Sequence, residues 1–301
     1  MIKKEFIDYL GEKSQLTEKS LIEKDFLLQS IIKKLTEEVF FQQNFLFKGG
    51  TCLIKCYLGY YRFSEDLDFT WRNQQLWEHK TGKEIRKEIS QVINDLSALI
   101  CEVSSSLRLQ FQPDKNDRRY MEFGAGNIFT TFKLWYHSAI SNQDEFIKIQ
   151  INFVEVMKYN SQKRLVNCLV EGVNQKEVRF LFPEYANAIS DKLEIEAYDL
   201  REILIEKIRA ILTRRTPKAR DFFDVFLISQ HLGENLEKYE KDILDKVLFM
   251  LKYEKYLNNL LHFTPEDNIL IKPLGEEFDT FMGEFYPFLQ QLLEKIKHET
   301  R

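Results

Sequence analysis

Hydrophobic residues recur at helical spacing in the N-terminal half of the chain. Residues 18–39 and 80–104 place apolar side chains three and four positions apart, a spacing that predicts two long amphipathic helices. A shorter and more apolar stretch, residues 52–58, predicts a buried helix that ends at Gly59.

Strand patterns alternate with these helices. The apolar run before Gly49 and Gly50 predicts a short strand that ends in a tight turn. Residues 63–71 alternate in polarity, so they predict a strand whose polar residues share one face. That face carries Ser64, Asp66, Asp68 and Thr70. Three further strands are expected at residues 107–111, 127–136 and 146–154.

The pattern becomes helical after Pro183 and stays helical towards the C-terminus. Pro217 should separate the first two helices of this part, and Gly233 should end the second. The expected helices are residues 198–216, 218–232, 234–262 and 275–298, with a loop at 263–275. The sequence therefore predicts an α/β domain at 1–190 and an all-helical domain at 191–301.

Composition and charge exclude several classes of protein. The chain has 301 residues, of which 44% are hydrophobic and 30% charged, enough apolar residues for one large core or two smaller ones. Its net charge of −4 excludes a globally basic nucleic-acid coat but leaves room for a local basic patch. Four cysteines are too few for a disulfide scaffold, and no apolar stretch has the length of a signal peptide or a membrane helix. We therefore expect a cytoplasmic protein with reduced thiols and no membrane partner.

The polar face of the strand at 63–71 carries the strongest candidate chemistry. Asp66 and Asp68 lie two positions apart, so both carboxylates project from the same face of a strand. Neighbouring carboxylates repel each other unless a cation lies between them, and Mg2+ binds one or two carboxylates together with phosphate oxygens. The alternative interpretation is a solvated strand face, on which two acids at this spacing are common.

A glycine pair precedes the acidic pair. Gly49 and Gly50 predict a turn whose backbone N–H groups can approach an anion without a side chain in the way. Ser64 shares the strand face of the acids and could donate a hydrogen bond to a phosphate. Together, these residues indicate a phosphoryl- or nucleotidyl-transfer site, in which metal ions bridge phosphate oxygens during an in-line displacement.

Residues 201–220 form a basic segment within an acidic chain, with seven basic residues against two acidic ones. Lys207 lies beside the apolar stripe of its helix, a position from which its ammonium group can reach a phosphate. The arginines of this segment are most simply a solvated helix surface, although the positive surface at 207–220 could also receive an acceptor molecule. Residues 114–119, DKNDRR, form a charged turn that could also lie against an RNA backbone.

Other charged residues have competing interpretations. Asp221 lies in the first turn of its helix, where it could cap the helix or belong to the site. Asp224, one turn further on, is expected to pair with Arg220 or Arg215. The Glu-Lys-Asp segment at 23–25 is expected to be surface charge or a salt bridge that packs its helix against the catalytic half.

Three blocks of the sequence resemble, in the same order, the blocks of a known family. They are LIEKDF at 21–26, FKGGTCLIKCYLGYYRFSEDLDF at 47–69 and AYDLREILIEKIRAILTRRTPKARDFFDV at 197–225. Together they resemble the AbiEii toxin-like nucleotidyltransferases, a branch of the polymerase-β-like superfamily. The resemblance implies an α+β fold, in which a nucleotidyltransferase domain with a mixed sheet flanked by helices is followed by an all-helical C-terminal domain.

The resemblance also implies an activity. Members of this family transfer a nucleoside monophosphate from an NTP to an acceptor with Mg2+, and some act as toxins that modify the 3′ end of tRNA. On this basis the chain is expected to be a toxin of a toxin–antitoxin or abortive-infection system, with a cognate antitoxin as partner. The residues that fall on the family's site are the nucleotide-binding Gly49, Gly50, Thr51, Ser64 and Lys207, the metal-binding Asp66 and Asp68, and the catalytic Asp66, Asp68, Lys207 and Asp221.

The strand at 146–154 departs from the superfamily's pattern, which often supplies a third carboxylate from a later strand. Its positions on the polar face are Lys148, Gln150 and Asn152, and Glu155 follows on the opposite parity. Two carboxylates could suffice, another acid such as the one at 221 could take the third role, or catalysis could be weakened. Two alternative functions therefore stay open: nucleotidylation of a protein hydroxyl, and a non-catalytic module that binds GTP or ATP and acts through a partner.

Overall fold

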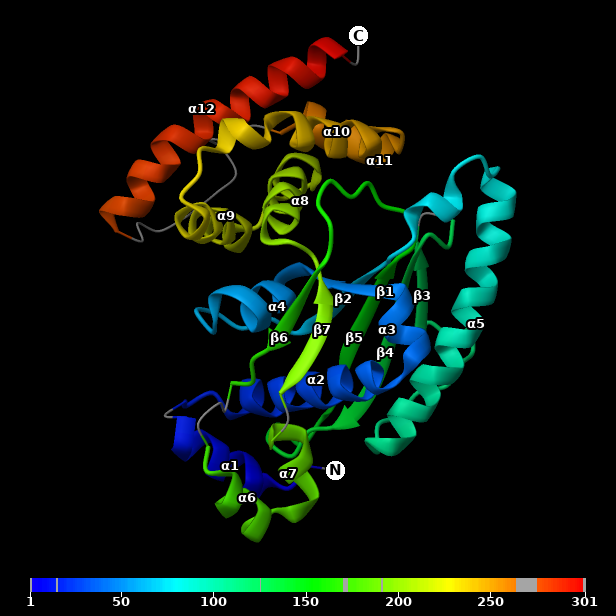
Figure 1. Cartoon of the computed structure of the whole chain (residues 1–301), viewed down its shortest axis with the longest axis vertical. Coiled ribbons are helices and arrows are strands. Elements are labelled where there is room, and N and C mark those ends of the chain that lie inside the picture. Colours follow the sequence, from blue (N-terminus) through cyan, green and yellow to red (C-terminus); the bar gives the residue numbers. More distant parts are fainter. Residues whose placement is uncertain are drawn as a thin grey trace. The chain divides into compact units, whose positions relative to one another are not determined.

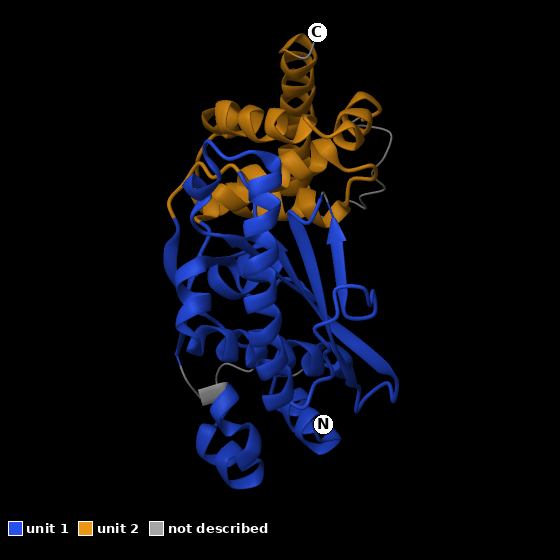
Figure 2. Ribbon diagram, turned by 90° about the vertical axis from the view of Figure 1, so that its right-hand side faces the viewer, with its two compact units in different colours: residues 1–155, 161–198 blue, residues 156–160, 199–301 orange. Residues whose placement is uncertain are grey.

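The computed structural model describes residues 2–14, 16–124, 126–169, 173–190, 192–263 and 275–299. The chain divides into two compact units, which have different colours in Figure 2. Unit 1 comprises Met1–Glu155 and Ser161–Tyr198, and unit 2 comprises Val156–Asn160 and Asp199–Arg301. Residues 264–274, which are most of the loop expected at 263–275, lie outside the described part of the chain.

A mixed sheet is the main element of unit 1 (Figure 1). Within the described residues its strand order is β3-β4-β5-β2-β1-β7-β6. β1 pairs with β7 and β2 pairs with β5 in parallel, whereas the other neighbours are antiparallel. The strands are β1 (Phe45–Lys48), β2 (Asp66–Trp71), β3 (Met121–Gly124), β4 (Phe129–His137), β5 (Asp144–Asn152), β6 (Gln162–Val166) and β7 (Leu193–Ala197).

Unit 1 also contains the two long helices that the periodic segments predicted. They are α2 (Lys19–Glu37) and α5 (Gly82–Ser106). Thr81 begins α5 with a capping box, in which its hydroxyl accepts from the N–H of Glu84 and the Glu84 carboxylate accepts from the N–H of Thr81. The other helices of this unit are α1 (Lys4–Ser14), α3 (Val39–Asn44), α4 (Gly49–Leu53), the π-helix η1 (Ile54–Leu58), the 3-10 helix η2 (Gln74–Trp77), α6 (Gln175–Leu181) and α7 (Pro183–Ser190).

Alternation along the central strands separates a buried face of the sheet from a polar face. On β2, Leu67 and Phe69 are buried, while Asp66 and Asp68 are half-exposed. β5 follows the same alternation, and its buried residues are Ile147, Ile149 and Ile151. α2 contacts β5 and β7. The period-two strand is therefore confirmed, although β2 begins at Asp66 rather than at residue 63.

Three expectations about secondary structure were wrong. The single helix expected at 234–262 is divided into a 3-10 helix, Leu236–Tyr239, and two α-helices, Glu240–Leu251 and Glu254–Leu261. Residues 107–111 form no strand in the described chain, where Gln110 makes only an isolated bridge to Trp135. Residues 193–197, expected to belong to a helical region, form β7, which is parallel to β1 and antiparallel to β6. The residues of β7, LEIEA, alternate in polarity, a period-two signal that the expectation of a continuous helical region overlooked.

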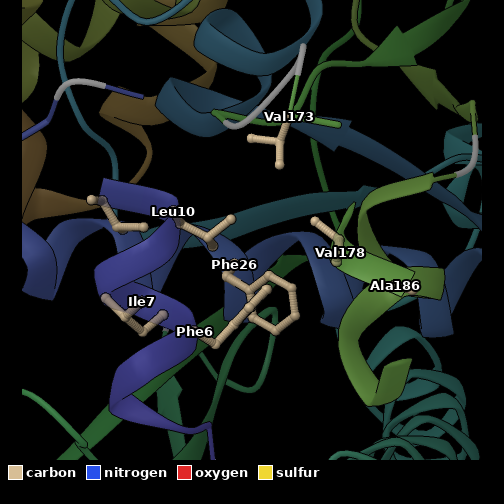
Figure 3. Close-up of a cluster of buried hydrophobic side chains, with 8 residues drawn as sticks. Phe6, Ile7, Leu10, Phe26, Val173, Val178 and Ala186 are labelled. Carbon is tan, nitrogen blue, oxygen red and sulfur yellow. The ribbon is translucent and has the colours of Figure 1, made fainter. Parts of the chain in front are cut away.

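A cluster of buried apolar side chains holds the N-terminal helix in unit 1 (Figure 3). The ring of Phe6 in α1 contacts Phe26 of α2 edge-on, with 5.1 Å between centroids, and stacks on Tyr185 of α7 at 4.3 Å. Aromatic pairs of this kind contribute about 0.5–1.5 kcal/mol each beyond the burial of their area. α1 is therefore packed against both α2 and α7.

The regular elements that the structure describes in unit 2 are all helices. Its elements are α8 (Leu200–Thr213), α9 (Ala219–Leu232), the 3-10 helix η3 (Leu236–Tyr239), α10 (Glu240–Leu251), α11 (Glu254–Leu261) and α12 (Glu276–Glu299). α9 ends, as predicted, at Gly233, which has a left-handed backbone with φ of 62°. The α+β class, with a mixed sheet, flanking helices and C-terminal helices, is confirmed. No helix among the described residues is both long and apolar enough to span a membrane.

A buried carboxylate ties residues 156–160 to the rest of unit 2. Glu202 of α8 pairs with Lys246 of α10, with 2.6 Å between Oε1 and Nζ. Its second oxygen accepts hydrogen bonds from the backbone N–H groups of Lys158 and Tyr159, both at 2.8 Å. Burial raises the pKa of the Glu202 carboxyl, because its charged form has left water. These contacts explain why a short segment distant in the sequence belongs to the helical unit.

Candidate active site

The turn after β1 brings the backbone against the acidic pair. Gly49 begins α4 with φ of 78°, a left-handed conformation that glycine adopts without strain. A Cβ atom at this position would stand 2.2 Å from Oδ2 of Asp68 and 2.9 Å from its Cβ. A glycine is therefore required for the turn to lie this close to the carboxylate.

Asp66 and Asp68 project from the same face at the start of β2, because they alternate with buried residues. In register, Lys48 of β1 lies opposite Asp68, and Lys148 and Gln150 of β5 lie beside the two acids. Across the part of the chain that the structure describes, no cationic side chain pairs with the Asp66 carboxylate. This half-exposed carboxylate can therefore accept a ligand from outside the chain.

The residues before β2 are tied to the glycine turn. Oγ1 of Thr51 lies 2.9 Å from Oγ of Ser64 and also hydrogen-bonds to the carbonyl oxygen of Asp66. Thr51 is buried, so its side chain positions the turn. Arg62 is a residue that sequence reasoning missed: its Nη2 atom is 2.9 Å from where a Cβ atom at Gly50 would stand. The signal that could have found it is its position in the segment RFSEDLD, two residues before Ser64 and in step with the two aspartates.

Glu155 reaches the polar face, contrary to the parity argument. β5 ends at Asn152, so the alternation that placed Glu155 on the opposite face does not extend to it. Nδ2 of Asn152 donates to Oε2 of Glu155 at 2.6 Å, and Nζ of Lys48 pairs with the same oxygen at 2.7 Å. Because Lys48 lies opposite Asp68 in the ladder, Glu155 balances a cation beside the acidic pair.

The Glu-Lys-Asp segment of α2 packs this helix against the catalytic half, which confirms the salt-bridge interpretation. Glu23 accepts a hydrogen bond at 2.6 Å from the hydroxyl of Ser138, in the turn between β4 and β5. Lys24 pairs with Glu65, the residue before β2, at 2.5 Å, and Asp25 pairs with Lys55 of η1 at 2.8 Å. Glu65 directly precedes Asp66, and η1 continues the helix that begins at the glycine turn. The segment therefore positions both parts of the site.

Lys207 of unit 2 lies between two aspartates. Its Nζ atom is 3.0 Å from Oδ1 of Asp221 and 2.7 Å from Oδ2 of Asp224, and both acids are buried. Arg214 also pairs with Asp221, so this carboxylate holds two cations instead of capping α9. Asp224 was expected to pair with an arginine of its own segment, and the structure pairs it with Lys207 of α8. Sequence reasoning missed this pair because it crosses between two helices.

The polar face suits a hard divalent cation that is bound together with a substrate. Asp66 and Asp68 offer oxygen ligands, and Mg2+ usually completes its six-coordinate shell with water and substrate phosphates. The described residues contain no group of three or more acids, histidines or cysteines that could hold a metal ion by themselves. Burial raises the pKa of the Cys52 thiol, which disfavours the thiolate form that binds metals. The two carboxylates therefore fit Mg2+ that arrives with a nucleotide.

Comparisons with known proteins identify the family of the chain. The family described as nucleotidyl transferase AbiEii toxin, type IV TA system, matches residues 33–297. The chain is similar to the crystal structure of JHP933 from Helicobacter pylori, with 19% identity, coverage of 95% of this chain and 96% of that chain, and a TM-score of 0.45. It is similar to a second H. pylori structure, described as a candidate nucleotidyltransferase, with 20% identity, coverage of 94% and 98%, and a TM-score of 0.44. A search of curated proteins returned no match. Because the family match covers most of its length, the chain belongs to the AbiEii family of nucleotidyltransferase toxins of type IV toxin–antitoxin systems.

Proposed function

We propose that this chain uses Mg2+ to transfer a nucleoside monophosphate from an NTP to the 3′ end of a tRNA. The observation that carries the proposal is the pair Asp66 and Asp68 on one half-exposed strand face, with the turn at Gly49 against Asp68. Family membership supports the nucleotidyltransferase class, the NTP substrate and a cognate antitoxin as partner. Action in the cytoplasm, where NTPs and tRNA are found, and a role in abortive infection belong to the same proposal.

Each residue of the polar face has a distinct task in this proposal. Asp66 and Asp68 hold the Mg2+, which supplies positive charge to the phosphate oxygens when it is bound. The glycine turn leaves room for the triphosphate beside backbone N–H groups, and Arg62 and Ser64 add donors for its oxygens. The acceptor's 3′ hydroxyl group then gives up its proton to water and its oxygen bonds to the α-phosphorus, the bond from that phosphorus to the bridging oxygen breaks, and pyrophosphate leaves.

The family resemblance assigns Lys207 and Asp221 to the same reaction. Two buried carboxylates hold the Lys207 ammonium group through charge-assisted hydrogen bonds, which fix the position of its charge. We assign Lys207 to the NTP phosphates and Asp221 to the positioning of Lys207. Both assignments predict that substitution of either residue lowers kcat/KM for the NTP in variants that are still folded.

A labelling experiment tests the proposed function. The chain is incubated with Mg2+, bulk tRNA and each of the four α-labelled NTPs, and the RNA and protein products are then separated. We expect label in RNA for the wild type, and for Asp68→Asn a loss beyond the roughly 100-fold typical of outer-shell partners at metal sites. Asp95→Asn, which changes an exposed aspartate of α5, is the matched control and should keep wild-type activity.

The distribution of label separates the proposal from its alternatives. Label on protein, and none on RNA, would contradict a tRNA acceptor and favour nucleotidylation of a protein hydroxyl. NTP binding without any transfer would contradict catalysis and favour a nucleotide-binding module that acts through a partner. Equal labelling of RNA by wild type and Asp68→Asn would remove the acidic pair from the mechanism.

A further inference from the structure

We infer that the polar face of the sheet, beside Asp66 and Asp68, binds an unpaired RNA strand that ends in the acceptor hydroxyl. The binding surface is a set of cationic and aromatic side chains that we call the aromatic row. Its members are Arg119, Trp135, Phe146 and Lys148. The inference rests on the proposed function and adds the form in which RNA is recognised, a single strand rather than a duplex.

The aromatic row lies on the same sheet face as the acidic pair. Trp135 on β4, and Phe146 and Lys148 on β5, alternate with buried residues of their strands. In the strand register, Trp135 lies opposite Phe146, and Lys148 lies opposite Asp66 of β2. Side chains that are opposite each other in a ladder project from the same face of a sheet. The row therefore begins one strand away from Asp66 and continues onto the next strand.

Contacts within the aromatic row hold its side chains next to one another. The guanidinium carbon of Arg119 is 4.8 Å from the ring centroid of Trp135, and the ring centroids of Trp135 and Phe146 are 4.7 Å apart. Nζ of Lys148 is 5.7 Å from the centroid of Phe146. Nε1 of Trp135 also donates to the carbonyl oxygen of Arg119 at 2.8 Å, which fixes the indole ring. The order of the row is thus cation, ring, ring, cation, and it is formed in advance of any ligand.

Neither cation of the aromatic row is neutralised by an ion pair within the described part of the chain. Arg119 is exposed and Lys148 is half-exposed, and neither forms an ion pair among the residues that the structure describes. Lys133, their neighbour on β4, is by contrast paired with Glu122 at 2.5 Å. On a chain with a net charge of −4, two cations that form no described ion pair and flank two aromatic rings are a local exception. They fit a polyanion better than an apolar protein surface.

The chemistry of the row favours unpaired bases. Proteins bind single-stranded RNA by stacking bases on aromatic rings and guanidinium planes, with cations beside them for the backbone. A duplex hides its base faces and could use only the two cations. The strand spacing places Trp135 roughly 12 Å from Asp66, a distance that a few nucleotides can span. The bases just before the acceptor hydroxyl would therefore lie on the row while the hydroxyl reaches the acidic pair.

Binding and transfer assays on full-length variants test the aromatic row. Trp135→Ala removes a stacking surface and Lys148→Ala removes a charge, whereas Trp135→Phe and Lys163→Ala are their matched controls. Lys163 is an exposed lysine of β6 that pairs with Glu194. The probe is an RNA hairpin with a single-stranded 3′ tail, and the comparison probe is the same RNA with its tail annealed to a complementary strand. Fluorescence anisotropy in the Asp68→Asn background measures binding apart from catalysis.

The expected results separate RNA binding from NTP binding. Trp135→Ala should weaken binding of the tailed RNA by roughly 5- to 100-fold, as the loss of one base-stacking side chain does. It should also raise the KM for RNA while the KM for the NTP stays unchanged. Lys148→Ala should reduce the slope of log affinity against log salt by about 0.7. Both control variants should bind the tailed RNA nearly as the wild type does.

Several results would overturn the inference. One is wild-type affinity in both Trp135→Ala and Lys148→Ala, and another is equal binding of the tailed and annealed RNA. Loss of a co-purifying antitoxin with unchanged RNA binding would mean that the row is a protein interface. If circular-dichroism melts show that Trp135→Ala does not fold, the inference is tested by Lys148→Ala, through its slope of log affinity against log salt. Failure of the proposed function looks different, because the wild type would then bind the tailed RNA without labelling it.

Discussion

Replacing Gly49 with alanine should disturb both the stability of the turn and the acidic pair. Gly49 has φ of 78°, and a non-glycine residue in this region costs about 1–3 kcal/mol. The added Cβ atom would stand 2.2 Å from Oδ2 of Asp68. The carboxylate must then leave its rotamer, and the turn must also shift because the added atom would stand 2.9 Å from Cβ of Asp68, at a cost of at least about 0.5–1.5 kcal/mol more. The two contributions together predict a loss of about 1.5–4.5 kcal/mol in the free energy of unfolding.

Gly59→Ala is the matched control for the backbone contribution. Gly59 has φ of 74° and ψ of −171°, a region that is essentially restricted to glycine. A Cβ atom there meets nothing within 4 Å, so Gly59→Ala should lose stability through the backbone alone and leave Asp68 in place. Urea unfolding measures the stability of both variants. Transfer of labelled NMP measures their activity at a temperature where both are folded.

The two glycine variants should differ in activity far more than in stability. We expect Gly49→Ala to lose about 100-fold in transfer rate, the cost of displacing a reacting group by 1 Å. Gly59→Ala should keep the wild-type rate. Equal transfer rates in the two variants would refute the claim that the close approach of the turn to Asp68 serves catalysis. Wild-type stability in Gly49→Ala would refute the strain argument.

Three further predictions concern unit 2. Asp224→Asn removes one of the two acids that hold Lys207. Steady-state kinetics should show a tenfold lower kcat/KM for the NTP, equivalent to about 1.4 kcal/mol, and Lys207→Met should lower kcat/KM further. Glu202→Ala leaves the buried ammonium group of Lys246 with only the more distant carboxylate of Glu206. Urea unfolding should show a loss of about 3 kcal/mol in the free energy of unfolding, and a loss under about 1 kcal/mol would contradict the importance of the buried pair. Burial raises the pKa of the Glu202 carboxyl above its usual 4.5 in the folded chain. As the pH falls through this raised pKa, the folded chain therefore binds a proton before the unfolded chain does, and the group adds to the free energy of unfolding. Glu202→Gln should lack this gain in stability. The test is to measure the urea midpoints of the wild type and Glu202→Gln from neutral pH down to 4.5; the same pH dependence in both proteins would contradict the prediction.

Local patterns predicted the parts of the site that are close together in the sequence. Asp66 and Asp68 share a face because a strand alternates, and that alternation is readable in six residues of β2. The glycine pair at the end of β1 was readable for the same reason, since its conformational freedom belongs to the residue itself. The C-terminal end of α9 was predicted correctly, because Gly233 can adopt the left-handed backbone that ends the helix. In each case one short segment contains the whole signal.

The parts that the sequence did not predict depend on contacts between distant segments. β7 pairs with β1 and β6, and although its five residues alternate in polarity, its glutamates and alanine are not typical of strands. Glu155 reaches the polar face because β5 ends before it, which depends on where the ladder stops. The pairing of Asp224 with Lys207 crosses between two helices. These pairings join segments that are distant in the sequence and meet only in the folded chain. Strand parity and helical periodicity describe single segments, so they could not predict them.

The most direct test of the acidic pair follows the phosphorus atom that is transferred. The wild-type chain and Asp66→Asn are each incubated with Mg2+, tRNA and an NTP that is labelled either at the α- or at the γ-phosphorus. The account predicts that α-label enters RNA, that γ-label leaves as pyrophosphate, and that Asp66→Asn or removal of Mg2+ with EDTA abolishes both. Transfer of γ-label to RNA, or α-label transfer by Asp66→Asn at the wild-type rate, would contradict it.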